Sequence, residues 1–422
     1  MTSRERPVEP KNLHHYTQAQ LDQFIDAHER FLTNQARARR AVLRFLQAEG
    51  IDLSGRRLGE ADFTGANFRN ARMMRTDFER ADLFCADLSG ADAREANFRR
   101  ADLRGVAFRD AALEGAILDE ADLREAVLMV SSAKDGMRMV RGAASEAHSG
   151  GPVTYTVDFT NCSMKKSKLR GAKLKGANFA GALLDGADLE GADLTGANFR
   201  GAVLIGVKLD RVIMDPDALK DCVTDPGPEA VAKVRELQSR LEGAQAWISS
   251  NGKIGAPARL DDEDLRPLGQ AFEGRRLTAL SAQRACGIGV SFAGAQLQAA
   301  KFDGADLRDA NFSGADLRGA SFKGANLHHA RFDNANLRDL PLGPDRTAPV
   351  DFSGAKYGTT AFSNAISLAE RGAPPAPGLP AIPVQADAES LWVRSSVEFQ
   401  INAAMTNCLW EASDGRAAMR PA

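Results

Sequence analysis

The stretch GADLEGADLTGANF, residues 186–199, repeats one short pattern three times in succession. A bulky apolar residue stands at Leu189, Leu194 and Phe199, and Ala stands two positions before each of them. This five-residue period fits neither an α-helix, with a period of 3.6, nor a plain strand, with a period of 2.0. The chain must therefore turn a corner in every repeat to bring the same side chain back to the same side.

The same register extends over three blocks, residues 51–130, 157–215 and roughly 271–340. Of the 38 central positions counted in them, 37 are Leu, Phe or Met and one is Ala93. Ala precedes the centre by two positions in 28 of the 38, and Gly commonly follows it by two, as a tight turn with positive φ requires. Chance does not hold one register over the 16 consecutive repeats of the first block. The pattern predicts a solenoid with bulky residues on its axis and alanine in its wall.

This A-(D/N)-L-x-x pattern resembles the pentapeptide-repeat family. The resemblance implies a right-handed, four-sided β-helix with four repeats per coil, so that residues 20 apart share a face. We therefore expect an all-β solenoid, a right-handed four-sided β-helix in two segments with α-helical caps. Neighbouring coils should be about 4.8 Å apart, and each added coil should add stability.

Breaks in the register suggest how the chain is organised. Thr17 and Gln20 form a capping box before an apolar stripe that includes His28, and a second helical stretch follows Pro228. A GRRL sequence follows each helical stretch, which indicates a duplicated unit of helix and solenoid. We expect these helices to plug solenoid ends, because an open coil exposes unpaired backbone groups that recruit other chains. The expected parts are a flexible tail (1–16), a helical N-terminal cap (17–50), a first β-helix (51–215) with an excursion at 131–156, a helical connector (216–270), a second β-helix (271–365), a Pro-rich linker (366–390) and a C-terminal amphipathic helix and tail (391–422).

The composition narrows the class of function. The chain has 54 Lys and Arg against 56 Asp and Glu, a formal charge of -2, which argues against a nucleic-acid binder. The N-terminal residues contain no signal-peptide core, and no apolar run approaches the length of a membrane span. The five cysteines are scattered and form no CxxC pair, which suits a reducing compartment. We expect a cytoplasmic protein that contacts neither nucleic acid nor membrane.

No residue pattern points to catalysis, to a cofactor or to a metal. P-loop, GxGxxG, GxSxG and HExxH motifs are absent, and the six histidines lack metal spacing. A ladder of aspartates (Asp62, Asp82, Asp102, Asp122) invites a catalytic or calcium interpretation. Each stands beside a buried centre, where its carboxylate can accept a backbone N–H at the corner, so the structural interpretation is favoured. We expect no enzyme, no cofactor and no metal site.

The candidate partner-binding residues are one outward apolar residue and one basic cluster. Phe84 directly follows a repeat centre, where side chains point outward. The basic cluster lies beside the excursion and comprises Lys165, Lys166, Lys168, Arg170, Lys173 and Lys175. The alternative interpretation of these cations is a solvated coil spread over several faces.

We therefore expect a non-enzymatic protein-interaction scaffold whose partner is a protein. The family resemblance leaves a homodimer through the C-terminal helix open. It also implies an alternative, a DNA-mimic binder or protector of a type II topoisomerase (gyrase), although a mimic requires a strongly acidic rod. A further alternative is a regulatory sensor switched through the 131–156 loop or the C-terminal helix.

Overall fold

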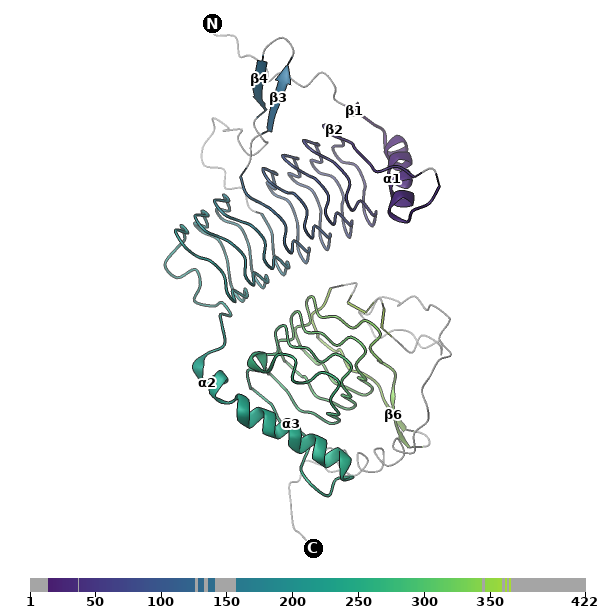
Figure 1. Cartoon of the computed structure of the whole chain (residues 1–422), viewed down its shortest axis with the longest axis vertical. Helices are drawn as coiled ribbons and strands as arrows, with labels where there is room; N and C mark the ends of the chain where they lie inside the picture. Colours follow the sequence, from purple (N-terminus) through teal and green to yellow (C-terminus); the bar gives the residue numbers. More distant parts are fainter. Residues whose placement is uncertain are drawn as a thin grey trace. The chain divides into compact units, whose positions relative to one another are not determined.

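The computed structural model describes residues 14–36, 38–125, 128–132, 136–140, 157–343, 346–358, 361–362 and 364–365. The chain divides into two compact units, Met1–Asp225 and Pro226–Ala422 (Figure 1). The predicted linker at 366–390 and the predicted C-terminal helix at 391–412 lie outside the described residues.

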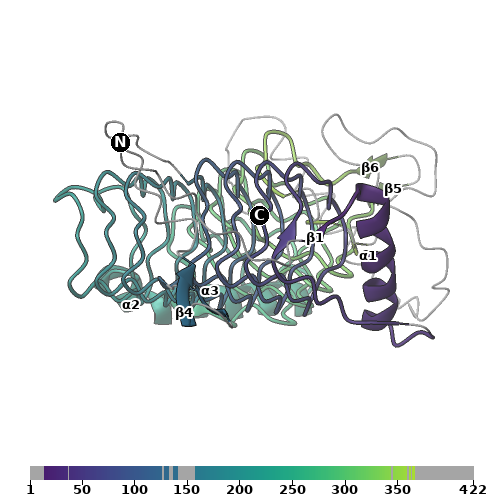
Figure 2. The ribbon, with the colours of Figure 1, turned by 90° about the horizontal axis from the view of Figure 1, so that it is seen from above.

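The first unit is a β-helix solenoid of stacked coils. Isolated parallel bridges join residues 20 apart, as in the series Asp62, Asp82, Asp102 and Asp122. Each coil therefore holds four five-residue repeats, and the rungs follow one another along the stack (Figures 1 and 2). The centres of the repeats point inward and stack on the centres one coil away.

Local hydrogen bonds explain why each repeat turns. The Oδ1 atom of Asp82 accepts the N–H of Phe84 at 3.0 Å, and that of Asp87 accepts the N–H of Ser89 at 2.9 Å. The residue two after the centre adopts a positive φ, 68° at Gly191 and 56° at Arg75. Glycine adopts this region without strain, whereas an L-residue with a side chain costs about 1 kcal/mol or more. The structural interpretation of the aspartate ladder is confirmed.

The N-terminal end of the first unit differs from the prediction. Helix α1 covers Gln18–Leu32, with the predicted capping box at Thr17, and so occupies only the first part of the predicted helical cap, 17–50. Strand β1 (His14–His15), predicted to lie in a flexible tail, pairs in parallel with β2 (Leu46–Gln47). The first coil already begins near Val42, which bridges to Asp62. The second repeat of this coil has Ala48 at its centre in place of a bulky residue. The five-residue pattern is therefore hard to recognise in this segment, whose composition also suits a helix.

The excursion interrupts a single coil without breaking the stack. The bridges from Ala112 to Asp158 and from Asp122 to Lys168 span 46 residues, which is one coil of 20 plus 26 inserted residues. The last bridged position before the inserted residues is Asp122, and the next one along the chain is Asp158. Between these points, β3 (Leu128–Ser132) and β4 (Gly136–Val140) pair antiparallel.

The second unit is also a stack of coils that follows a helical segment. Helices α2 (Pro228–Ala232) and α3 (Val234–Ser249) precede the coils, and Leu237 and Leu241 of α3 are buried against them. The coils begin at residue 258, not at 271 as predicted, because the 3-10 helix η2 (Arg266–Leu268) lengthens the first coil to 22 residues and obscures its period. A hairpin of β5 (Leu340–Gly343) and β6 (Arg346–Ala348) interrupts the last coils.

The predicted helical connector is also too long at its beginning, since the bridge from Val203 to Val223 makes residues 216–223 part of the last coil of the first unit. Among the described residues, no helix has the length and apolar character needed to cross a membrane.

Candidate functional site

Two of the predicted candidates, Phe84 and Arg170, fall on one corner of the first β-helix. The N–H of Cys85 donates to Arg104 O at 2.8 Å, and that of Gly105 donates to Arg124 O at 3.0 Å, so these corners stack coil upon coil. The register across the excursion then places Arg170 after Arg124. We call this set, Phe84, Arg104, Arg124 and Arg170, the arginine column.

The arginine column is ordered by contacts within the wall. The guanidinium carbon of Arg104 lies 5.1 Å from the centroid of the Phe84 ring, a cation–π arrangement. Arg104 and Arg124 each bind the aspartate two residues earlier through Nε and Nη2, at 2.8 and 2.5 Å to Asp102 and at 2.8 and 2.7 Å to Asp122. The hydrogen bond to Asp102 raises the pKa of Arg104 above its ordinary value. Phe84 is half-buried, so it is less exposed than a free anchor would be.

The basic cluster divides between the column and other sides of the solenoid. Lys168 and Arg170 lie along the column, and Arg170 forms ion pairs with Glu190 and Asp188. Lys173 and Lys175 follow on the next face, where Lys173 Nζ lies 2.9 Å from Glu125. Lys165 and Lys166 lie at the preceding corner, and Lys165 Nζ lies 3.9 Å from Asp119. The structure thus brings only part of the cluster to Phe84.

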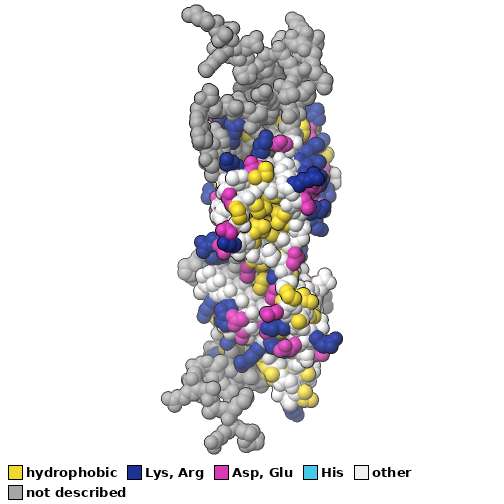
Figure 3. Space-filling model, turned by 90° about the vertical axis from the view of Figure 1, so that its left-hand side faces the viewer, with side chains coloured by type: hydrophobic (Ala, Val, Ile, Leu, Met, Phe, Trp, Pro, Cys, Tyr) yellow, Lys and Arg dark blue, Asp and Glu magenta, His cyan; other side chains and the backbone are white. Residues whose placement is uncertain are grey.

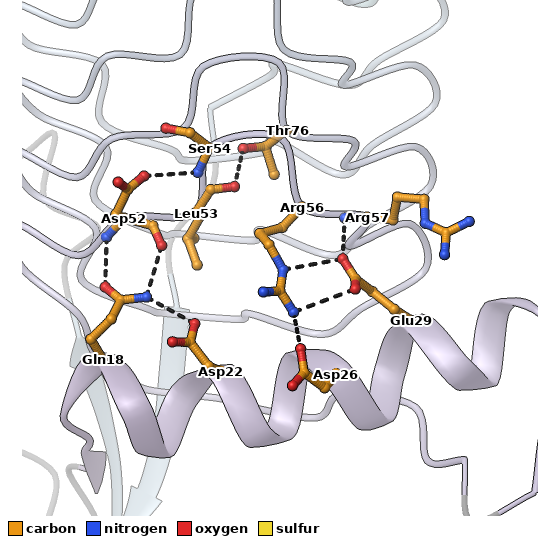
Figure 4. Close-up of polar contacts among 10 residues, drawn as sticks. All are labelled: Gln18, Asp22, Asp26, Glu29, Asp52, Leu53, Ser54, Arg56, Arg57 and Thr76. Carbon is orange, nitrogen blue, oxygen red and sulfur yellow. Dashed lines mark hydrogen bonds and ion pairs between the residues drawn. The ribbon is translucent and has the colours of Figure 1, made fainter. Parts of the chain in front are cut away.

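The N-terminal end of the first β-helix is closed by side chains of α1 (Figure 4). The side-chain amide of Gln18 donates to Asp52 O at 2.9 Å and accepts the Asp52 N–H at 3.0 Å, as a neighbouring strand would. Glu29 accepts the N–H of Arg57 at 2.9 Å and also pairs with the Arg56 guanidinium. Helix α1 therefore satisfies backbone groups along the edge of the coil that it covers.

His28 completes this closure. It is fully buried, its Nδ1 accepts the N–H of Ala41 at 3.1 Å, and its Nε2 lies 2.9 Å from Gly59 O. These partners assign the neutral tautomer with the proton on Nε2. Desolvation by burial lowers the pKa of His28, in agreement with a neutral ring. The sequence analysis placed His28 on the apolar stripe of this helix. His28 is the one polar residue of that stripe, and this position indicated a hydrogen-bonding role for its ring.

At the opposite end of the first β-helix, no described helix of the first unit covers the last coil. In the last coil, residues 207–225, the inward-pointing Leu209 is 36% exposed, whereas Leu189 one coil earlier is fully buried. The other inward apolar residues of this coil are only half-buried: Val207, Val212, Met214, Leu219 and Cys222. Figure 3 shows hydrophobic side chains gathered on this surface. We call it the open end.

The open end also carries free backbone groups. In earlier coils the N–H of a centre donates to the following coil, as Leu189 does to Lys208 O at 3.2 Å. The N–H groups of Leu209, Arg211 and Met214 occupy the corresponding positions and make no hydrogen bond within the described part of the chain. The last coil is thus an exposed β-edge around an apolar centre.

The described residues offer little for chemistry. They contain no group of three or more His, Cys, Asp or Glu side chains placed to hold a metal ion. Cys85, Cys162, Cys222 and Cys286 form no disulfide bond. Burial raises the pKa of Cys162, Cys222 and Cys286, the reverse of what an activated nucleophile needs.

Comparison with known proteins identifies the repeat. A family model described as pentapeptide repeats matches in eight copies, which include residues 49–84, 61–100, 81–119, 107–129, 177–215, 291–324 and 300–339. No curated protein sequence matches the chain.

Solved structures that align with the chain include pentapeptide-repeat proteins. HetL of the cyanobacterium Nostoc sp., involved in heterocyst differentiation regulation, is 20% identical over 73% of this chain and 93% of its own, with a TM-score of 0.34. A trypsin-treated variant of QnrB1, a plasmid-mediated fluoroquinolone resistance protein, is 15% identical over 77% and 94%, with a TM-score of 0.17. A thylakoid-lumen protein of Arabidopsis thaliana is 20% identical over 36% and 71%, with a TM-score of 0.16. The repeat itself decides the assignment, and the chain belongs to the pentapeptide-repeat family.

Proposed function

We propose that this protein is a non-enzymatic, cytoplasmic scaffold that presents the outer wall of its first β-helix to a protein partner. The contact surface is the arginine column with its neighbours Lys168 and Lys173. We further propose that both β-helices are right-handed and four-sided, as the family resemblance implies.

One observation carries this proposal: four successive coils place an aromatic ring and three guanidinium groups on a single corner. Aromatic and arginine side chains are enriched among the residues that dominate protein interfaces. Because coils are about 4.8 Å apart, the column presents these groups at fixed intervals over about 14 Å.

The ion pairs within the arginine column hold its side chains in place, which favours a role in binding a protein partner over a role as a solvated surface. Arg104 and Arg124 are held by Asp102 and Asp122 through Nε and Nη2. Side chains ordered before binding lose less conformational entropy when a partner arrives. Arginine has five N–H donors, and Nη1 of Arg124 makes no hydrogen bond to the described residues, so it can donate to a partner's carboxylate or carbonyl.

A matched pair of variants tests the proposal. Arg94 binds Asp92 through the same two atoms, both at 2.7 Å, and its side chain is 46% exposed against 45% for Arg124, but it stands on another corner. Tagged full-length protein is purified from its native cell with bound proteins identified by mass spectrometry. We expect a specific partner to be lost from Arg124→Glu and retained by Arg94→Glu. Equal retention by both variants would reject the arginine column as the contact surface.

The topoisomerase alternative requires an acidic rod, and the described contacts count against it. Asp62, Asp102 and Asp122 of the aspartate ladder are each paired with an arginine, at 2.6, 2.5 and 2.7 Å. The repeats of residues 51–130 and 157–215 make about seven coils, which span about 34 Å. Duplex DNA carries about one negative charge per 1.7 Å, so a mimic of this length would need on the order of 20 net negative charges. Residues 51–130 hold 12 Lys and Arg against 16 Asp and Glu, and residues 157–215 hold 9 against 7. We expect no inhibition in a gyrase supercoiling assay at low salt, and potent inhibition at sub-micromolar protein would restore this alternative.

The sensor alternative is tested by limited proteolysis with and without the purified partner. A partner-dependent change in cleavage within residues 131–156 or 391–412 would support it. An unchanged digestion pattern would reject it.

A further inference from the structure

We infer that the partner docks on the arginine column as an amphipathic α-helix, which lies along the axis of the first β-helix and carries one apolar side chain followed by a row of carboxylates. The apolar side chain meets Phe84, and the carboxylates meet Arg124 and Arg170. This inference rests on the proposed scaffold function and names the chemistry of its partner.

The spacing of the column selects a helix over an extended strand. Coils follow one another at about 4.8 Å, so the four positions from Phe84 to Arg170 span about 14 Å. Residues on one face of a helix recur once per turn, at about 5.4 Å, and stay within about 2 Å of successive coils over three turns. Residues on one face of a strand recur at about 6.7 Å and are a full coil out of step by the fourth position.

One end of the column is strongly basic. Residues 157–176, which we call the basic coil, hold six Lys and Arg against one Asp. In this coil Lys168 takes the place of the ladder aspartate, since the bridge from Asp122 leads to it. Lys168 is exposed and forms no ion pair with the described residues, and the side chain of Lys173 on the adjoining face is 78% exposed. These two cations flank Arg170, so this end of the column attracts the carboxylates of a partner.

The other end of the column favours an apolar side chain. Phe84 is half-buried, and the guanidinium of Arg104 lies over its ring. Asp82 and Asp87 stand on the two faces that meet at this corner, where they would repel a carboxylate. An apolar residue of the partner would instead cover the Phe84 ring and the stem of Arg104.

The charges beyond the column determine where the helix ends. One coil past Arg170 the corner carries Glu190, and Asp188 stands on the face beside it. These acidic side chains would repel a further carboxylate. The last carbonyl groups of a helix lack intrahelical partners and carry partial negative charge, so Lys168 and Lys173 favour the C-terminal end of the helix at the basic coil.

The test uses three synthetic peptides of equal charge on the full-length protein. The one-faced peptide is a capped helix of about 20 residues, mostly Ala and Gln, in which Glu follows a single Leu by four, seven and eleven positions, so that all four side chains share one face. The spread peptide has the same composition with its Glu residues distributed around the helix, and circular dichroism verifies that both are helical. The extended peptide has Glu at alternate positions and a Pro that prevents a helix.

Binding is measured by fluorescence anisotropy at low salt. We expect the wild type to bind the one-faced peptide at least about ten-fold more tightly than either of the others. Arg124→Glu should weaken this binding at least about ten-fold, and so should Lys168→Glu, which breaks no ion pair with the described residues. Arg94→Glu, on another corner, should change it less than about two-fold.

Several results would overturn the inference. They are equal affinities of the one-faced and spread peptides, no binding of either, and tighter binding of the extended peptide, which would assign an extended partner. A preference that survives both Arg124→Glu and Lys168→Glu would also overturn it, because the peptide would then bind elsewhere. Failure of the scaffold function has a different readout, since it appears as a native partner that Arg124→Glu still retains.

Discussion

The two ends of the first β-helix meet solvent in different ways, although the same five-residue repeat builds both. At the N-terminal end, α1 lies across the coil, and Gln18, His28 and Glu29 bind its backbone groups. At the C-terminal end the chain departs with Leu209 partly exposed and without a helix of the first unit over it. A repeat alone therefore does not finish a solenoid, because its last coil has the same unmet hydrogen-bonding groups as its first.

The difference shows how a helix can replace a coil. A helix offers no free backbone groups along its side, so the edge must be satisfied by side chains of suitable length and chemistry. In α1 the Gln18 amide binds the backbone of Asp52, and the His28 imidazole binds the carbonyl of Gly59. The Glu29 carboxylate accepts the backbone N–H of Arg57. Leaving a buried group of this kind unsatisfied costs about 1–3 kcal/mol, which is why the contact depends on particular residues and not on apolar burial alone.

The largest expected effect separates the interior of the stack from its open end. Leu189 is fully buried, and Leu189→Asp would place a charge without a partner on the solenoid axis. We expect it to lower the free energy of unfolding of the first unit by more than about 4 kcal/mol. Leu209→Asp, whose carboxylate reaches water at the open end, should lower it by no more than about 1–2 kcal/mol. Urea unfolding followed by circular dichroism measures both, and equal losses would show that the last coil is not an open end.

The next effect concerns the closed end. His28→Ala removes both hydrogen bonds of the ring and leaves a cavity, so we expect a loss of about 2–4 kcal/mol in the stability of the first unit. Phe24→Ala on the same helix is the control, because Phe24 is 42% exposed and should cost about 1 kcal/mol or less. If the two variants lose the same stability, α1 is held by general apolar contact and the contrast between the ends disappears.

A pH titration sharpens the same contrast. Burial lowers the pKa of His28 in the folded chain, whereas an unfolded histidine has a pKa of about 6.5. The unfolded chain therefore binds the proton more readily, so stability is complete above about pH 6.5 and falls as the pH drops below it. Arg40 opposes protonation of the ring, and Glu29 and Glu60 favour it.

The closed end should weaken in acid while the open end is unaffected. Hydrogen exchange at Ala41, whose N–H donates to His28, compared with exchange at Ala187 and Ala192 near the open end, distinguishes the two. His328 in the second unit, whose pKa burial lowers to about 4, gives the same sign there, so the readout must be resolved by residue. Acid-induced exchange that is equal at both ends would contradict a role of His28 in the closure.

Much of this molecule could be predicted from its five-residue period, because the period itself is the fold. The inward direction of Leu189 and the corner role of Asp82 follow from position in the repeat, and the structure places both as expected. The predicted boundaries were wrong where the chain departs from the five-residue period. Ala48 at a centre hid the first coil, and the turn at 266–268 hid the first coil of the second unit.

The sites were harder to predict, because they depend on residues that lie far apart in the sequence. The arginine column joins Phe84 to Arg170 across 26 inserted residues, which is the length of the excursion predicted at 131–156, but the contacts of Arg104 with Phe84 and Asp102 are not visible in the repeat. The centres Leu204, Leu209 and Met214 continue the pattern to the open end, although Val207 and Val212 replace the usual Ala two positions before Leu209 and Met214. Whether an end is covered depends on tertiary packing and not on local periodicity.

The smallest expected effect concerns Glu190, one coil before the open end. Glu190 pairs with Arg170 and lies 3.9 Å from Arg211 of the last coil, so its side chain does more than face water. Glu190→Lys replaces both attractions by repulsion. Because Arg170 and Arg211 are largely exposed, the loss in stability should be about 1 kcal/mol or less, and it should shrink as added salt screens the charges. Faster hydrogen exchange confined to residues 207–215 would place the effect at the open end. A loss as large as that of Leu189→Asp would instead mean that the inward and outward positions of the repeat have been assigned the wrong way round.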